Sequence, residues 1–434
     1  MIMLLAAETL DGYYVLLLLG VMILVGMFAG RFIEKYNIPN ITGYLLLGVV
    51  FGGLLIFIGY TNFVENFSVV MSVALGFIVF SIGMELDIKK LTRRRNEIIV
   101  ITIIQALAAF LFTALGVFIF RIPLHIALLF GAIAIATEPG PILLITKKYR
   151  TKGPLTDTLI PLHGIEDAFA IIVFGIVLSY AVSVYQGQSL AFLDILYGPI
   201  FELLFSIIVA VIIGVIFKTI IKYLEYEDPE KDQVVYVTAL VAVLISVAVA
   251  NIGLHIYGLH VHLSPILVPM GVGIVFANMS SRKAKHETEN IVDQFSPPIM
   301  IAFFTIIGAE IVMILHQELG TLGGTFVFVI ALVYILFRVL GKLVGSWMGA
   351  TIMRSDKGVR KYLGLCLLPQ AQAAIGLAFY ARRQLDYSYY GNLILVVVLI
   401  ATFVYEIFGP FGVKLSLSRC KESDMYGNCI VSEK

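Results

Sequence analysis

Long apolar segments recur along the whole chain, and they restrict its fold more than any other feature of the sequence. A run of about 18 or more apolar residues is long enough to cross a bilayer as a helix. Of the 434 residues, 60% are hydrophobic and 14% charged, whereas an ordinary soluble domain has roughly a quarter of its residues charged. This composition excludes a disordered chain, a nucleic-acid-binding protein, a coiled coil and a small disulfide scaffold. The runs are too long and continuous for β-barrel strands, so we predict an all-α polytopic membrane protein.

Thirteen candidate transmembrane helices are found with a window of about 19 residues. They cover residues 13–30, 41–59, 67–86, 97–120, 123–146, 155–184, 196–223, 233–250, 263–279, 291–315, 321–350, 358–381 and 389–413. We expect them to form a single transmembrane domain over residues 1–434. The three cysteines, none of them in a CxxC pair, predict neither a disulfide framework nor a zinc site.

The basic residues predict the orientation of the chain in the membrane. With the N-terminus outside, 25 of the 30 Lys and Arg residues fall in the inner loops or the C-terminal tail, and only Arg121, Arg382 and Arg383 fall outside. Short cytoplasmic loops carry an excess of Lys and Arg. We therefore expect an outer N-terminus and a cytoplasmic C-terminus, in the inner or plasma membrane.

Two pairs of similar segments indicate an internal repeat. GVVFGG at residues 48–53 is similar to GIVFAN at 273–278, and FSIGMEL at 80–86 is similar to TIIGAEI at 305–311, both at an offset of 225 residues. The offset corresponds to seven helices, and because seven is odd the two halves have opposite topology, as in many transporters. The predicted repeats and connector helix span residues 13–184, 233–413 and 196–223.

Proline and glycine interrupt two of the apolar spans at corresponding places in these repeats. TEPGP occupies Thr137 to Pro141, and PQAQAAIG occupies Pro369 to Gly376. Such runs disfavour helix, and unwound backbone at membrane depth occurs only where it is buried in protein or lines a cavity. Paired breaks therefore indicate a substrate site, with two ordinary proline kinks as the alternative. The polar residues at these two predicted breaks are Thr137, Glu138, Gln370 and Gln372.

Adjacent acids lie inside the sixth span. Glu166 and Asp167 are about ten residues from the start of their helix, and ionisable residues within the membrane are costly and usually functional. Two such neighbours titrate as a coupled pair, which suits a competition between protons and a metal cation. His163 shares their helical face, where it either tunes their pKa or is a hydrogen-bonded core histidine.

Basic residues lie within the eleventh span. Arg338 and Lys342 are one helical turn apart, and a buried lysine needs an acidic partner or a lowered pKa. We expect Lys342 to pair with the acids of the sixth span, and Arg338 either to pair with Glu138 or to be structural.

Other charged residues have simpler interpretations. Glu85, Glu202, Glu310 and Glu406 lie near the ends of spans, and we interpret them as interfacial charges. His255, His260 and His262 lie outside with a spacing loosely suggestive of metal binding, but no acidic or cysteine ligand accompanies them.

Together these residues resemble the cation/proton antiporter superfamily, particularly its bacterial sodium/proton antiporters. The resemblance covers nearly the whole chain. It rests on ITGYLLLGVVFGG, FIVFSIGMELDIKKL, a Thr-acid-Pro break, an acidic pair in the next helix, GVGIVFAN and a Gly-Lys in the eleventh helix. It implies two broken helices that cross near the midplane of the membrane beside the acidic pair, and it also implies a homodimer.

By position, the resemblance implies roles for single residues. Asp167 matches the ion-binding aspartate, and Glu166 matches the neighbour that exchanges a salt bridge with the lysine corresponding to Lys342. Thr137 and Glu138 match the Thr-Asp of the family's crossover. The chain departs from the family in its Glu-Asp pair, where members have Asp-Asp, Asn-Asp or Gln-Asp, and in its crossover glutamate. Each extra methylene moves a carboxylate, so the stoichiometry and the ion selectivity are not predicted.

The sequence therefore predicts a secondary active antiporter and not an enzyme. We expect exchange of cytoplasmic Na⁺, or of Li⁺ or K⁺, for external H⁺, with Na⁺ and protons competing for Asp167 and with no cofactor. A K⁺/H⁺ antiporter and a cation channel that uses the same carboxylates are the alternatives. An intramembrane enzyme has little support, because no HExxH, paired-Asp or GxSxG motif is present.

Overall fold

The chain folds as helices that are long enough to cross a membrane. The computed structural model describes residues 12–35, 40–58, 63–85, 95–138, 142, 145–146, 149–186, 192–227, 231–256, 259–261, 263–280, 282–322 and 324–422. Among these residues, nine helices have the length and composition of membrane spans, and three shorter apolar helices accompany them. Two three-residue strands, β1 (Leu254–Ile256) and β2 (Leu259–Val261), pair in antiparallel fashion. The predicted all-α membrane class is confirmed.

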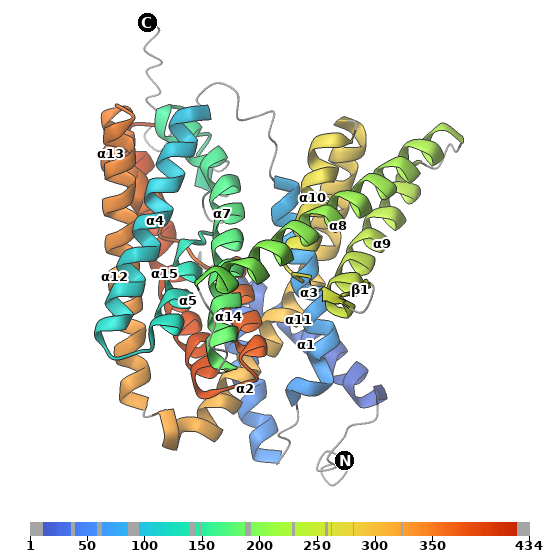
Figure 1. Cartoon of the computed structure of the whole chain (residues 1–434), viewed down its shortest axis with the longest axis horizontal. Helices are drawn as coiled ribbons and strands as arrows, with labels where there is room; N and C mark the ends of the chain where they lie inside the picture. The colour runs from blue at the N-terminus through green and yellow to red at the C-terminus, as the bar shows by residue number, and fades with distance from the viewer. Residues whose placement is uncertain are drawn as a thin grey trace, which may run out of the picture. The chain divides into compact units, whose positions relative to one another are not determined.

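The helices belong to two compact units (Figure 1). The first unit, Met1–Asp87 with Ile200–Gly323, contains α1 (Gly12–Glu34), α2 (Asn40–Ile58), α3 (Phe63–Glu85), α9 (Lys231–Ile252), α10 (Leu267–Met279) and α11 (Arg282–Leu322). The second unit, Ile88–Pro199 with Gly324–Lys434, contains α4 (Arg95–Ile119), α5 (Leu124–Ile135), α7 (Pro154–Tyr185), α12 (Gly324–Ile352), α13 (Lys357–Cys366), α14 (Gln372–Gln384) and α15 (Tyr389–Arg419). Helix α8 (Phe192–Glu227) passes from the second unit into the first.

Two predicted spans are interrupted, as the sequence predicts, and a third is longer than expected. The span predicted at 123–146 is helical to Ile135, leaves the helix at residues 136–138 and is helical again at residues 142 and 145–146, and the span at 358–381 consists of α13 and α14 with a non-helical segment between them. The span at 291–315 belongs to the longer helix α11, which begins at Arg282. Its first turns are rich in Lys, Ala and Glu, which favour helix without apolar packing, so this stretch is helical and not the expected loop.

Glycines let helices of the first unit approach each other closely. A Cβ on Gly48 of α2 would lie 2.2 Å from the carbonyl oxygen of Thr305 of α11, and one on Gly83 of α3 would lie 2.1 Å from the carbonyl oxygen of Met270 of α10. Small residues at such contacts increase packing between membrane helices. The segments that suggested the repeat thus pack crosswise, each against the half that it does not belong to, while the repeat itself stays a prediction.

A row of glycines has the same effect in the second unit, where α12 packs along α4 (Figure 1). Gly341, Gly345 and Gly349 recur at every fourth position of α12, and a Cβ on Gly345 would lie 2.6 Å from the Cα of Gln105 on α4. This spacing places the glycines on one helical face. The close approach brings Gln105 beside the basic residues of α12.

Two glutamates interpreted as interfacial are instead buried. The side chain of Glu310 in α11 is 0% exposed, and that of Glu406 in α15 is 1% exposed. Both lie well inside their helices, because α11 and α15 extend beyond the spans predicted from hydropathy. The interpretation was wrong because it used the distance of each acid from the predicted end of its span, and both helices end several residues later.

Candidate functional site

Helix α7 carries the acidic pair in the interior of the second unit. The Glu166 side chain is 0% exposed and the Asp167 side chain 2% exposed. Both lie in the middle of the helix and away from its ends, as the sequence predicts. A buried carboxylate needs donors or a cation to replace water, so the neighbours of these acids decide what the site can do.

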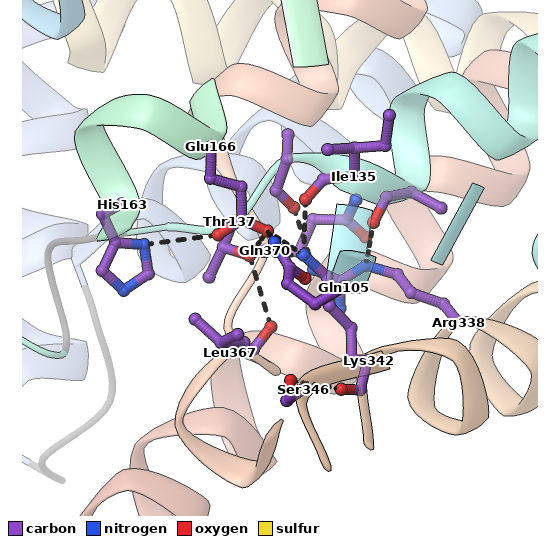
Figure 2. A network of polar contacts seen from close by, with 12 residues as sticks. Gln105, Ile135, Thr137, His163, Glu166, Arg338, Lys342, Ser346, Leu367 and Gln370 are labelled. Carbon is purple, nitrogen blue, oxygen red and sulfur yellow. Dashed lines mark hydrogen bonds and ion pairs between the residues drawn. The ribbon is translucent and has the colours of Figure 1, made fainter. Parts of the chain in front are cut away.

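Glu166 is the centre of a network of donors (Figure 2). Its Oε1 atom pairs with Nζ of Lys342, and both side chains are fully buried. The same oxygen accepts hydrogen bonds from Nε2 of Gln105 at 2.8 Å and from Oγ1 of Thr137 at 3.1 Å. Nδ1 of His163 lies 3.8 Å from the other carboxylate oxygen. The structure thus brings together four of the predicted residues and adds Gln105.

Lys342 connects this carboxylate to the first break. Its ammonium group also donates to the carbonyl oxygen of Ile135 and to Oγ1 of Thr137, at 2.5 Å and 2.9 Å. A lysine has three donor hydrogens, and these three acceptors match them. Asp167 lies within electrostatic range of the same ammonium group. One cation is therefore shared by the acidic pair and the end of α5.

The final turn of α5 exposes carbonyl groups that α12 and the second break satisfy. The last carbonyls of a helix have no partner within the helix and carry partial negative charge. Arg338 donates to the carbonyls of Ala134 and Ala136 at 3.0 Å and 2.9 Å, and Nε2 of Gln370 donates to Ile133 at 3.0 Å. With Lys342 on Ile135, each carbonyl from residue 133 to residue 136 has a donor.

The second break is held by donors from the first break and from α12. The carbonyls of Leu367, Leu368 and Pro369 accept hydrogen bonds from Oγ1 of Thr137 at 3.3 Å, Nη1 of Arg338 at 2.8 Å and the backbone N–H of Glu138 at 3.0 Å. The two broken helices thus bind each other directly. Arg338 donates to both of them, which accounts for a fully buried guanidinium in this position.

The remaining predicted residues lie at the crossover, at the start of α14 and in the β-hairpin. Glu138 is buried at the crossover, and Gln370 also exchanges hydrogen bonds with the hydroxyl of Tyr334. Gln372 begins α14, and its side chain lies outside the described residues. The backbones of His255 and His260 pair in the hairpin, but their side chains and the whole of His262 lie outside the described part of the chain.

Sequence reasoning missed several residues of this network. Gln105 could have been predicted as a site residue, because it is a lone amide side chain within an apolar span. Tyr334 and Tyr405 could not have been predicted, because aromatic residues are common in such spans. Tyr405 lies under the guanidinium of Arg338, 4.5 Å from its ring centroid, and donates its hydroxyl hydrogen to the carbonyl of Ile335.

A residue beyond the last helix holds the start of α7, and it was also missed. The Glu422 carboxylate accepts hydrogen bonds from the backbone N–H groups of Leu155 and Thr156 at 2.8 Å and 2.9 Å. Acids stabilise helix N-termini in this way. A Cβ at Gly153 would lie 2.5 Å from Cδ of Glu422, and its φ of 150° also favours glycine. Residue 422 therefore positions the helix that carries the acidic pair.

Comparison with known proteins identifies the family of this chain. The family model described as sodium/hydrogen exchanger, transmembrane, matches residues 19–411. The chain belongs to the sodium/hydrogen exchanger family. It is therefore a membrane protein of a cation/proton antiporter family, which is a family of transporters and not of enzymes. A search of curated protein sequences found no significant match.

Solved structures agree with this fold. A structure of the sodium proton antiporter MjNhaP1 from Methanocaldococcus jannaschii at pH 8 aligns with a TM-score of 0.74 at 18% identity, covering 92% of this chain and 97% of that one. A second structure of MjNhaP1, from electron microscopy, aligns with a TM-score of 0.71 at 17% identity, covering 96% and 99%. At this identity the likeness concerns the fold.

Proposed function

We propose that this antiporter exchanges Na⁺ for H⁺, and that the two cations compete for Asp167. The observation that carries this proposal is the buried ion pair between Glu166 and Lys342 at the crossover, directly beside Asp167. Asp167 also lies within electrostatic range of the Lys342 ammonium group. A carboxylate in that position is stable when it holds a proton or a metal cation, but it cannot hold both.

This competition couples the two fluxes. When the site faces the outside, Asp167 takes up a proton, and when it faces the cytoplasm, Na⁺ binds at Asp167 and displaces that proton. If the Glu166–Lys342 pair also takes up and releases a proton, two protons move for each Na⁺. Transport then moves net charge, and the membrane potential contributes about 2.3 kcal/mol per charge for each 100 mV.

Several further properties belong to this proposal. We place the N-terminus outside and the C-terminus in the cytoplasm of an inner or plasma membrane, on the distribution of Lys and Arg. The protein acts as a homodimer without a cofactor. Its two halves are inverted repeats, which the crosswise packing of α2 on α11 and of α3 on α10 supports.

Transport by purified protein in liposomes tests the assignment. A preset pH gradient should collapse when Na⁺ is added, and Asp167→Asn should reduce that rate about 100-fold or more, in keeping with the loss of an essential intramembrane charge. Asp157→Asn is the matched control, because Asp157 lies on the same helix but is exposed. Exchange by Asp167→Asn at the wild-type rate would remove Asp167 from the mechanism.

The same assay separates the alternatives. Na⁺, Li⁺ and K⁺ are added in turn, with and without a voltage clamp. A response to K⁺ alone would make the protein a K⁺/H⁺ antiporter. Cation flux that leaves an imposed proton gradient intact would indicate a channel that uses the same carboxylates.

A further inference from the structure

Three buried oxygen atoms lie on one face of α15 without a hydrogen-bond partner in the described part of the chain. They are both carboxylate oxygens of Glu406 and the hydroxyl oxygen of Thr402. Glu406 is 1% exposed and Thr402 is 0% exposed, and four-residue spacing places them one helical turn apart. An ionised carboxylate that is buried without hydrogen-bond donors loses its hydration, and no other interaction compensates for that loss. Burial therefore favours the protonated acid.

Glu406 faces the crossover of the two broken helices. Gly409 follows it by three residues and so shares its side of α15, and a Cβ on Gly409 would lie 2.9 Å from the Cα of Pro369. The carbonyl of Pro369 in turn accepts the N–H of Glu138 at 3.0 Å. The carboxyl groups of Glu138 and Glu406 lie within electrostatic range of each other.

Charged and titratable groups lie on each of the helices α12, α13 and α14 that pack against α15. On α12, Arg338 donates to carbonyls of both breaks, and its guanidinium lies over the ring of Tyr405. Tyr334, also on α12, donates its hydroxyl hydrogen to Gln370. Lys342 is paired with Glu166. Helix α13 brings the buried thiol of Cys366, and Nε of Arg382 on α14 donates to Oδ1 of Asn392 near the start of α15. Within the described residues, none of these cations forms an ion pair with Glu406.

We propose that Glu406 is a second proton-binding site, beside the crossover that carries Glu138, and that its carboxyl group holds one proton at neutral pH. A buried carboxyl group without donors favours its neutral form, and a second carboxyl group nearby disfavours its ionisation further. The proton is taken up from a hydronium ion, whose O–H bond breaks to leave water, and it forms an O–H bond on the Glu406 carboxylate. This site does not include Asp167, and the proposal does not depend on the exchange cycle described above.

Infrared spectroscopy of the purified protein tests the site without any transport measurement. The difference spectrum between wild type and Glu406→Gln should contain the C=O band of one protonated carboxyl group at neutral pH, with the shift expected on exchange into heavy water. Glu406→Gln resembles the protonated acid in shape and should fold. Glu34→Gln is the control, because Glu34 is exposed, and it should leave the band in place.

A second variant, Glu138→Gln, tests the proposal without changing Glu406 itself. Glu138→Gln removes the like charge, so the titration midpoint of the Glu406 band should fall by about one pH unit. If the protein carries no Na⁺/H⁺ exchange, the infrared result still stands, so the two proposals fail separately.

Two outcomes would overturn the proposal. One is a protonated band that Glu406→Gln leaves unchanged in intensity and midpoint. The other is a midpoint that moves when Na⁺ replaces choline at constant ionic strength in an Asp167→Asn background, because the ligand of Glu406 would then be a metal cation and not a proton.

Discussion

Two helices of the second unit bring a buried glutamate to the crossover, and the two acids differ in what surrounds them. On α7, Glu166 has an ion pair with Lys342 and hydrogen bonds from Gln105 and Thr137. On α15, Glu406 has no hydrogen-bond donor among the described residues. The same residue type at similar burial is therefore expected to be ionised in one place and neutral in the other. Neighbours, and not the side chain itself, determine the charge state.

Removing the cation from the α7 side should have the largest effect. Lys342→Met leaves Glu166 as an uncompensated buried charge, which typically costs about 3–5 kcal/mol. The α15 acid has no cation to lose, so Glu406→Gln should change stability by about 1 kcal/mol or less. Thermal unfolding of both variants in detergent measures the difference.

A double variant checks the reason for this effect. Glu166→Leu together with Lys342→Met should recover most of the lost stability, because replacing a buried ion pair with apolar groups is often close to neutral. Equal stability losses in Lys342→Met and Glu406→Gln would contradict the contrast between the two helices.

Removing one donor from Glu166 should have an intermediate effect. Gln105→Leu deletes a hydrogen bond to an ionised group, for which about 1.5–3 kcal/mol is typical. Thr102→Val is the matched control on α4, because the Thr102 hydroxyl donates only to the carbonyl of Ile98 in its own helix. If both variants unfold at the same temperature, Gln105 does not stabilise an ionised Glu166.

The smallest effect is expected at the start of α7. Glu422→Ala removes the cap from Leu155 and Thr156, and such losses cost about 0.5–2 kcal/mol. Hydrogen exchange should quicken at the first turn of α7 and not along α15. Arg419→Ala serves as the control, because this neighbouring side chain is exposed. Unchanged exchange at residues 155 and 156 would show that the cap does not hold this helix.

The sequence predicted those parts of the site in which proline, glycine or charged residues interrupt an apolar segment. Proline and glycine marked both breaks, and isolated charges marked Glu166, Asp167, Arg338 and Lys342. The all-α membrane class followed from the apolar runs. These features could be recognised from the sequence because polar groups and unwound backbone are costly in a bilayer and therefore rare there.

Other parts required the fold. The partners of Arg338 are backbone carbonyls of both breaks, and a carbonyl has no sequence signature. Glu422 caps a helix that begins more than 250 residues earlier in the chain, a pairing that only the tertiary structure reveals. Glu406 was visible as a charge, but its depth depended on a helix end that hydropathy placed too early.

Proton release on Na⁺ binding is the most direct test of the central claim that the two cations compete for Asp167. Na⁺ is added to purified protein in weakly buffered solution, with choline as the control salt, and the pH change is recorded. The account predicts release of protons by wild type and by Asp157→Asn, and no release by Asp167→Asn. Release by Asp167→Asn equal to that of wild type would contradict it.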